Sequence, residues 1–315
     1  MPATKDPIPG VAVAIAPGLR RIVAANPSAF TAQGTNTYLI GVCDVAVIDP
    51  GPNLAAHKQA ILAALAPGSR ISHILVTHAH LDHSALARPL AEATGAQVLA
   101  FGDAMAGRSA AMAAFALEGD LQGGEGVDHD FRPDRCLPDG ALVQGQGWVL
   151  RALHTPGHMS NHLCFAWEGH LFSGDHVMGW STTFISPPDG DMGAYMASLR
   201  RLQTGDWRSL LPGHGAPVAQ AKARLQMLYD HRKAREAAIL DCLRDNAQQI
   251  PAMVAQIYPD LARPLQAAAA RNVLSHLLDL VWRGVVTADP GPDPSARYRL
   301  AAVGSPQTGA PHQTG

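Results

Sequence analysis

Three histidines and one aspartate lie within six residues of the stretch THAHLDHS, directly after an apolar run. Side chains alternate in an extended segment, so His78, His80 and Asp82 can share one side. His83 joins them if a helix begins at this point, and Ser84 onward has helical spacing. Neutral imidazole nitrogens and carboxylate oxygens suit Zn²⁺ and related divalent ions. The spacing therefore predicts metal ligands at the end of a strand.

Further candidate ligands follow later strand-like runs, in the stretches HTPGHMSNH, FSGDH and LPGHG. They are His158, Asp175 and His214, and a glycine comes immediately before each of them. Glycine lets the backbone turn sharply and approach a neighbour closely. With the first cluster this makes seven ligands, enough for two metal ions with one shared carboxylate. His162, four residues after His158, is a candidate hydrogen-bond donor to the transition state.

Such a set of ligands predicts hydrolysis. Two divalent ions would lower the pKa of a bridging water to roughly neutral and supply a hydroxide. The ions would also stabilise the negative charge that develops on the attacked group. Asp82 is expected to handle the proton on the leaving group as well. The ligands fit attack on a carbonyl or a phosphoryl centre and do not choose between them.

The elements that must position these ligands are short strands that alternate with helices. Strands are expected at 36–42, 44–51, 71–78, 96–102, 148–155, 161–169 and 170–179. Helices are expected at 55–65, 84–95 and 192–203. This is the pattern of a mixed α/β fold. Residues 103–135 differ, because an alanine-rich helical piece leads into a glycine-rich, acidic stretch typical of an exposed loop.

The character of the chain changes from about residue 219. One long amphipathic helix is expected over 220–246, followed by helices at 250–259 and 261–284 and by two strands within 285–302. That order is typical of a winged-helix module. We therefore expect a catalytic domain over 1–220, a long helix plus a winged-helix-like domain over 221–302, and a disordered tail over 303–315.

The motifs VIDPG, VTHAHLDHSA, HTPGHMSNH, FSGDHV and LLPGHG occur in this order over roughly residues 30–218. In this combination the chain resembles the metallo-β-lactamase superfamily. The resemblance implies an αββα sandwich with a dinuclear site at one edge. It also implies that Asp49 steadies the ligand loops from behind. By resemblance, the first ion is held by His78, His80 and His158. The second ion is held by Asp82, His83 and His214, and Asp175 bridges the two ions.

The C-terminal stretches DHRKAREAAIL, VAQIYP and LSHLLDLVWRGVV resemble the lactamase-β-like branch of that superfamily. This branch carries a winged-helix domain and includes an endoribonuclease that acts on single-stranded RNA. The first hypothesis is therefore hydrolysis of phosphodiester bonds in single-stranded RNA by a hydroxide that bridges two ions. The stretch STTFISPPDGDMGAYMASL contains a longer loop than we expect of the animal enzymes, so their substrate preference does not transfer directly.

Other hypotheses remain beside the first. A thioester or lactone hydrolase of the glyoxalase II type keeps the same seven ligands. A true zinc β-lactamase is disfavoured because that branch lacks the counterpart of Asp175. The β-CASP nucleases are excluded, since only 39 residues separate Asp175 from His214 and leave no room for their inserted domain. A metal-bearing module that binds nucleic acid without turnover is the non-enzymatic alternative.

Charge and composition limit the kinds of partner and cofactor that the protein is expected to bind. The net charge of −2 gives no general attraction to nucleic acid or to a membrane. Residues 222–302 carry 11 Lys and Arg against 8 Asp and Glu, a weak excess that fits either a nucleic-acid-facing region or a solvated helix face. With no membrane-spanning run, no secretory signal and four scattered cysteines, we expect a cytoplasmic protein. Its expected cofactors are two divalent ions, first Zn²⁺, with Mn²⁺ or Fe as alternatives. A homodimer through the winged helix is compatible with the sequence.

Overall fold

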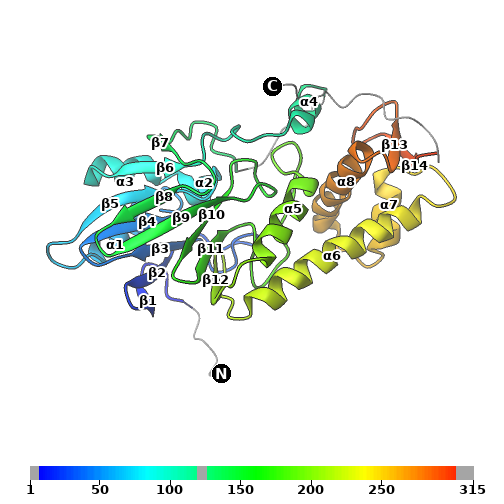
Figure 1. Cartoon of the computed structure of the whole chain (residues 1–315). Coiled ribbons are helices and arrows are strands. Elements are labelled where there is room, and N and C mark those ends of the chain that lie inside the picture. Colours follow the sequence, from blue (N-terminus) through cyan, green and yellow to red (C-terminus); the bar gives the residue numbers. More distant parts are fainter. Residues whose placement is uncertain (1–6, 119–125, 303–315) are drawn as a thin grey trace.

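Two β-sheets stacked face to face form the larger part of the protein (Figure 1). The computed structural model describes residues 7–118 and 126–302. The first sheet has seven strands in the order β1-β2-β3-β4-β5-β6-β7. Its strands are β1 (Val13–Ala16), β2 (Leu19–Val23), β3 (Asn36–Ile40), β4 (Asp44–Ile48), β5 (Arg70–Leu75), β6 (Gln97–Ala100) and β7 (Arg135–Cys136). The strands β1 to β4 are antiparallel, and β4 to β7 are parallel.

The second sheet has five strands in the order β12-β11-β10-β9-β8. Its strands are β8 (Leu142–Gly145), β9 (Trp148–His154), β10 (Leu163–Trp167), β11 (His170–Gly174) and β12 (Ser209–Pro212). Apolar side chains of both sheets meet in a shared core that includes Tyr38, Leu75, Phe165 and Phe172. Strands β3 and β11 are buried along their whole length, including polar residues such as Asn36, Thr37 and Ser173.

Helices cover the outer face of each sheet. Helices α1 (Ala55–Ala63) and α3 (Ala87–Thr94) share a core with the first sheet. Helices α5 (Met192–Gln203) and α6 (Ala221–Cys242) share one with the second sheet. The result is the predicted αββα sandwich, so the expected fold class is confirmed.

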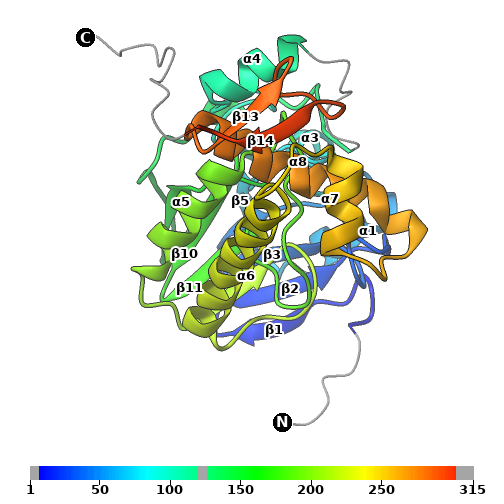
Figure 2. The same ribbon diagram turned by 90° about the vertical axis from the view of Figure 1, so that its right-hand side faces the viewer.

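The C-terminal elements form a separate core beside the sandwich (Figures 1 and 2). They are α7 (Ile250–Ile257), a 3₁₀ turn at Arg263–Leu265, α8 (Gln266–Trp282), and the antiparallel pair β13 (Val286–Asp289) and β14 (Arg297–Leu300). This is the predicted winged-helix order. Helix α4 (Ala110–Glu118) joins that core through Met112 and Phe115, although it precedes it by more than a hundred residues.

Three details differ from the expectations. The helix expected from Ser84 is two helices, and the first, α2 (Leu81–Ser84), begins directly after His80 because the backbone N–H of Ser84 donates to the His80 carbonyl. The alanine-rich helix is shorter than expected, since Gly107 takes a positive φ of 76° just before it. Residues 119–125 of the expected loop and the expected tail over 303–315 lie outside the described residues.

Candidate metal centre

The structure brings all seven predicted ligands together at one edge of the sandwich, where strands of both sheets end. The first four lie on the segment from the end of β5 into α2. His158 lies on the loop between β9 and β10, while Asp175 follows β11 and His214 follows β12. Residues that are far apart in the sequence therefore converge because parallel or neighbouring strands carry them to the same place.

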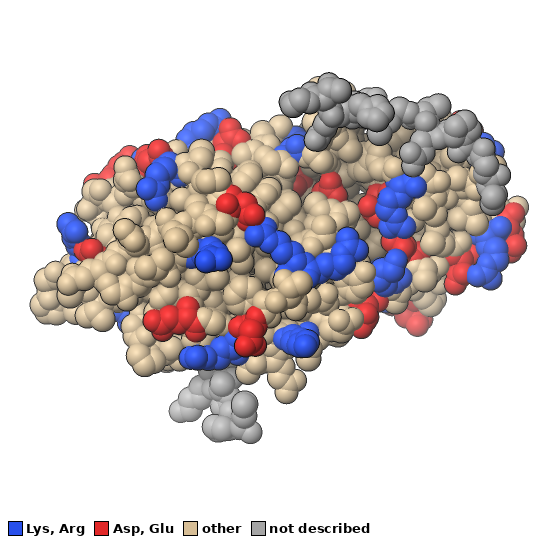
Figure 3. Space-filling view, viewed as in Figure 1, with Lys and Arg blue, Asp and Glu red and all other residues tan. Residues whose placement is uncertain are grey.

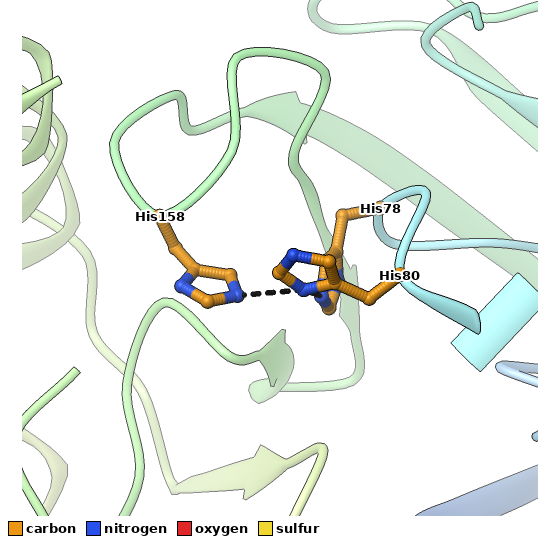
Figure 4. A group of neighbouring side chains, drawn as sticks. All are labelled: His78, His80 and His158. Carbon is orange, nitrogen blue, oxygen red and sulfur yellow. Dashed lines mark hydrogen bonds between the residues drawn. The ribbon is translucent and has the colours of Figure 1, made fainter. Parts of the chain in front are cut away.

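His78, His80 and His158 form the first group (Figure 4). His158 points from its loop toward the other two rings, which come from the segment after β5. The Nδ1 atom of His80 lies 2.9 Å from Nε2 of His78 and 3.0 Å from Nε2 of His158. Tetrahedral Zn²⁺ with ordinary Zn–N bonds places its nitrogen ligands about 3.3 Å apart. The three nitrogens are thus spaced as ligands of one ion.

Asp82, His83 and His214 form the second group, and Asp175 lies between the two. The Nε2 atom of His214 is 3.3 Å from Oδ2 of Asp82 and 3.3 Å from Oδ2 of Asp175. On the other side, Oδ2 of Asp175 is 3.8 Å from Nε2 of His158. One carboxylate therefore faces both groups.

Hydrogen bonds on the outer side of the ligands leave their inner nitrogens free for a cation. Thr77 Oγ1 donates to Asp49, so it can only accept from Nδ1–H of His78, 2.9 Å away. The Nδ1–H of His83 donates to Oδ2 of Asp49 at 2.9 Å, and that of His158 donates to the Phe184 carbonyl at 2.7 Å. Histidines that bind metals are usually held in this way. In each ring the Nε2 atom keeps its lone pair and points inward.

The residues present fit a bound metal. Once Nδ1 of His78 carries the proton, its Nε2 lone pair faces another imidazole nitrogen, an arrangement that a shared cation makes favourable. Oδ1 of Asp175 is buried without a hydrogen-bond partner among the described residues. A buried acceptor with no donor is costly, and a bound cation removes that cost. Imidazole and carboxylate are also the donor types that Zn²⁺ takes.

The glycines before the later ligands are needed for close approach, as the sequence predicted. A Cβ on Gly157 would lie 2.5 Å from the Cα of Tyr195. A Cβ on Gly174 would lie 2.6 Å from Nε2 of His162, and one on Gly213 would lie 2.5 Å from Oδ1 of Asp175. Any larger residue at these positions would push the ligand loops apart.

Burial and charge act differently on the two groups. Burial lowers the pKa of His80 to about 3 and, together with the neighbouring histidines, holds the pKa of His78 well below its usual range. These imidazoles are neutral, as metal ligands must be. In the second group burial works in the same direction, but Asp175 and Asp82 outweigh it and raise the pKa of His214 to about 9. Carboxylates thus set the charge of the second group.

The candidate His162 and two further histidines pack near the ligands. His162 is fully buried, its ring stacks on His78 with centroids 5.2 Å apart, and its Nδ1 lies 3.0 Å from Thr155 Oγ1. Its ring packs against a ligand, and its Nε2 atom is buried without a hydrogen-bond partner among the described residues, so the donor role that the sequence suggested stays a prediction. His154 stacks on Phe101 and contacts the Ser160 carbonyl, and His176 packs on Tyr195.

Several residues of the site carry no local signal in the sequence. Thr35 donates to Oδ2 of Asp82 at 3.0 Å from a loop 47 residues away. The Phe184 carbonyl holds His158, but any residue offers a carbonyl, so its identity says nothing. Thr77 was within reach of sequence reasoning, because it directly precedes His78 and threonine hydroxyls often bond to neighbouring groups.

Large apolar side chains are exposed beside the ligands, and we call Phe30, Leu81 and Trp180 the apolar rim. Their exposures are 68%, 47% and 45%. Leu81 lies between two ligands in the sequence, and Trp180 packs against Gly215, the neighbour of His214. Phe30 contacts Phe184, with ring centroids 6.5 Å apart. Exposed apolar side chains therefore lie on or against the segments that carry or hold the ligands.

The fold and the ligands define a class of protein, and comparison with known proteins names it. The profile of the metallo-beta-lactamase superfamily matches residues 30–214, and that of the beta-lactamase associated winged helix domain matches residues 250–292. The chain belongs to the metallo-β-lactamase superfamily. It is a hydrolase of that superfamily, whose members typically bind two metal ions.

Three relatives illustrate the match. An atrochrysone carboxyl ACP thioesterase from Aspergillus fumigatus is 31% identical over 73% of this chain, and the match spans 66% of that relative, just under two thirds. A beta-lactamase-like protein 2 homolog from Caenorhabditis elegans is 31% identical over 84% of this chain and 85% of its own length. A beta-lactamase domain protein from Burkholderia ambifaria has the same fold, with a TM-score of 0.76 at 24% identity, covering 94% of this chain and 96% of the other.

Within the described residues, no helix is both long enough and apolar enough to span a membrane.

Proposed function

We propose that this protein is a dinuclear metal-dependent hydrolase of thioesters whose acyl part is apolar. The observation that carries the proposal is the apolar rim beside the seven ligands. Thioester hydrolysis is one of the alternatives that the sequence leaves open, and the rim favours it over the polyanionic substrate of the first hypothesis. The proposed ions are Zn²⁺, because the inner atoms are imidazole nitrogens and carboxylate oxygens.

The two ions would supply a water of near-neutral pKa and polarise the thioester carbonyl. The protein's residues hold the ligands, exclude water and handle protons. Thr77 and Asp49 fix the rings of His78 and His83 from behind. Asp82 is the most exposed of the charged ligands, with 29% of its side chain accessible, so its carboxylate is placed to receive or return a proton. A thiol has a pKa of about 8.5 and leaves readily as the thiolate, so little further acid help is needed.

The relatives support the same proposal. Relatives from Aspergillus fumigatus, Paecilomyces divaricatus and Cryptosporiopsis are described as atrochrysone carboxyl ACP thioesterases. Their identities with this chain are 28–31%. Identity at this level supports a shared reaction type, and it does not transfer the particular acyl group.

Hydrolysis of single-stranded RNA is the second candidate, because the chain carries a winged-helix domain. Two observations weigh against it. On the face shown in Figure 3, Lys and Arg over the C-terminal elements are interspersed with Asp and Glu, where phosphate recognition calls for a dense basic patch. Helix α8, which precedes the β13–β14 pair, has no fully exposed residue between Arg271 and Leu280. A recognition helix must instead present side chains to the nucleic acid.

The test is a substrate panel with Zn²⁺-loaded protein. Acyl thioesters of increasing chain length, a lactone, a β-lactam and labelled single-stranded RNA are incubated in parallel, and released thiol or cleaved product is measured. We expect thioester turnover that rises with acyl length. The matched control is Asp175→Asn in the same preparation, which separates turnover by this site from a contaminant. RNA cleavage without thioester turnover would replace the proposal by the second candidate.

A further inference from the structure

The loop from Met178 to Asp189, which we call the ligand loop, connects the metal centre to the C-terminal domain. It follows β11 and Asp175 and leads to α5. Its Phe184 carbonyl accepts the Nδ1–H of His158. The hydroxyl of Thr183, one residue earlier, donates to the carbonyls of both Asp175 and His176 at 2.9 Å. Two neighbouring residues of one loop thus bind a ligand of the first group and the backbone of Asp175, whose carboxylate faces both groups.

Three arginines from the C-terminal helices hold this loop in turn. From α6, Arg224 donates to the carbonyls of Met178 at 2.6 Å and Ser181 at 2.5 Å. Arg232, also on α6, donates to the Thr183 carbonyl. From α8, Arg271 donates to the Ser186 hydroxyl at 3.1 Å. A guanidinium group has several donors in a fixed plane, so one side chain can bind more than one acceptor at a time.

Arg232 is the central one of the three. It is only 3% exposed, and among the described residues it forms no ion pair. Its other nitrogen donates to Oδ1 of Asn272 on α8 at 3.2 Å, and its guanidinium lies 5.5 Å from the centroid of the Tyr195 ring. A buried cation with neutral acceptors is costly and is retained only where its hydrogen bonds are used. Here they join α6, α8 and the ligand loop.

A second route leads from Arg232 to the centre through Tyr195. A Cβ on Gly157 would lie only 2.5 Å from the Cα of Tyr195, so α5 packs directly on the residue before His158. Arg232 lies over the ring of that tyrosine. Displacement of the arginine therefore loosens both the backbone before His158 and the carbonyl behind it.

We propose that Arg232 is a positioning residue of the metal centre and that the winged-helix-like domain serves to hold the ligand loop. The proposal rests on the proposed metal centre. A supporting role also accounts for the burial of α8. This helix supplies Asn272 to Arg232 and Arg271 to the ligand loop, and its middle is packed against protein. The domain thereby contributes to the hydrolase through the loop that supports its ligands.

The experiment measures the affinity of the metal-free full-length protein for Zn²⁺ alone, by competition with a chromophoric chelator. Arg232→Met keeps the length of the side chain but removes its donors. Thr183→Val keeps the shape but removes the hydroxyl. We expect each to weaken Zn²⁺ binding by about 10–100-fold, the usual effect of removing an outer support of a ligand. Excess Zn²⁺ should restore most of the thioester activity of both variants.

The matched control is Arg235→Met, one turn along the same helix. Arg235 lies over the ring of Tyr258 within the C-terminal domain, 4.8 Å from its centroid, and forms no hydrogen bond to the ligand loop. Its Zn²⁺ affinity should equal that of the wild type. Equal weakening in this control, or wild-type affinity in both folded test variants, would overturn the proposal.

Two further outcomes are decisive. Circular dichroism and thermal unfolding show which variants fold, and if Arg232→Met does not fold, Thr183→Val alone decides. A wild-type protein that binds no Zn²⁺ would overturn the metal centre and this proposal together. Wild-type affinity in the test variants, beside a wild-type protein that binds Zn²⁺ and hydrolyses thioesters, would overturn only the positioning role.

Discussion

The metal centre and the contact between the sandwich and the C-terminal domain both bury charged side chains, but they arrange them in opposite ways. At the centre, seven side chains turn their free acceptor atoms toward common points. At the domain contact, Arg232 turns its donors outward to acceptors on different elements. Converging acceptors create a place for a cation, whereas diverging donors join separate segments together. Burial of charge alone therefore does not identify a reactive site.

The two regions also differ in the groups that surround their charged side chains. In the centre Asp175 and Asp82 raise the pKa of His214 to about 9 against the effect of burial. At the domain contact burial lowers the pKa of Arg232, and its hydrogen-bond acceptors are a carbonyl and an amide. The first region can exchange its protons for metal ions. The second keeps one fixed charge and has a mechanical role.

The largest expected effect comes from removing the carboxylate that faces both ligand groups. Asp175→Asn keeps the shape but loses the negative charge, so at least one ion should bind poorly. We expect kcat/KM for a thioester to fall by about 10³-fold or more, since the ions supply several kcal/mol of charge stabilisation. Enzyme kinetics and the metal content of the same preparation check this. Unchanged metal content and activity would show that the acceptors do not converge on ions.

A smaller effect is expected where a carboxylate supports ligands without binding the ions. Asp49 accepts hydrogen bonds from Nδ1–H of His83 and from the backbone N–H and hydroxyl of Thr77. In Asp49→Asn an amide NH₂ group replaces one carboxylate oxygen and faces an N–H or O–H donor, so one of these hydrogen bonds is lost. Zn²⁺ binding should weaken by about 10–100-fold. Asp44→Asn is the control, because Asp44 begins strand β4, which ends directly before Asp49, but it pairs with the exposed Arg70. Equal behaviour of the two variants in chelator competition contradicts the support role.

The apolar rim should affect substrate affinity more than metal binding. Trp180→Ala removes exposed aromatic surface next to the neighbour of His214. We expect KM for an octanoyl thioester to rise about tenfold, with little change for an acetyl thioester, because only the longer chain covers the ring. Trp282→Ala, at the exposed end of α8, is the control and should leave both KM values as they are. A similar rise for both thioesters would argue that Trp180 acts through the ligands.

The smallest effect concerns an ion pair inside the C-terminal domain. Burial would raise the pKa of Glu236, but hydrogen bonds from Arg283 and Lys233 outweigh it and lower that pKa to about 2. The carboxylate therefore stabilises the fold above its unfolded pKa of 4.5, and the contribution is lost as the pH falls toward 2. Because both partners are partly exposed, Glu236→Gln should cost about 1 kcal/mol or less at pH 7.

Urea unfolding of wild type and Glu236→Gln at several pH values tests this prediction. The difference between them should shrink between pH 4.5 and pH 3. A constant difference over the range from pH 7 to pH 3 would mean that the charge of Glu236 does not contribute. Zn²⁺ affinity should be the same in both proteins, which keeps this pair apart from the loop that Arg232 holds.

The sandwich and the seven ligands could be predicted because their signals are local. Alternating strand and helix patterns give the αββα order, and each ligand follows a strand end, often with a glycine that the fold requires. The exact start of the helix at Leu81 could not be predicted, since the Ser84 contact that begins it resembles that of many turns. The position of His162 behind His78 depends on how two sheets pack, which four-residue spacing does not contain.

The link from Arg232 to Thr183 could not be predicted at all. The two residues are 49 positions apart, and one of them contributes only a backbone carbonyl. The sequence instead drew attention to the weak basic excess of residues 222–302 as a possible sign of contact with nucleic acid. The fold places one arginine of that stretch inside the protein, and a charge count treats buried and exposed arginines alike.

The ligands differ widely in their access to solvent, and this gives the centre an order of events. Side-chain exposure is 29% for Asp82 but only 10% for Asp175 and 2% for His214. An ion that arrives at the second group from solution therefore meets Asp82 before it reaches the buried atoms. Asp82 is the open side of that group, and Asp175 and His214 are its enclosed side.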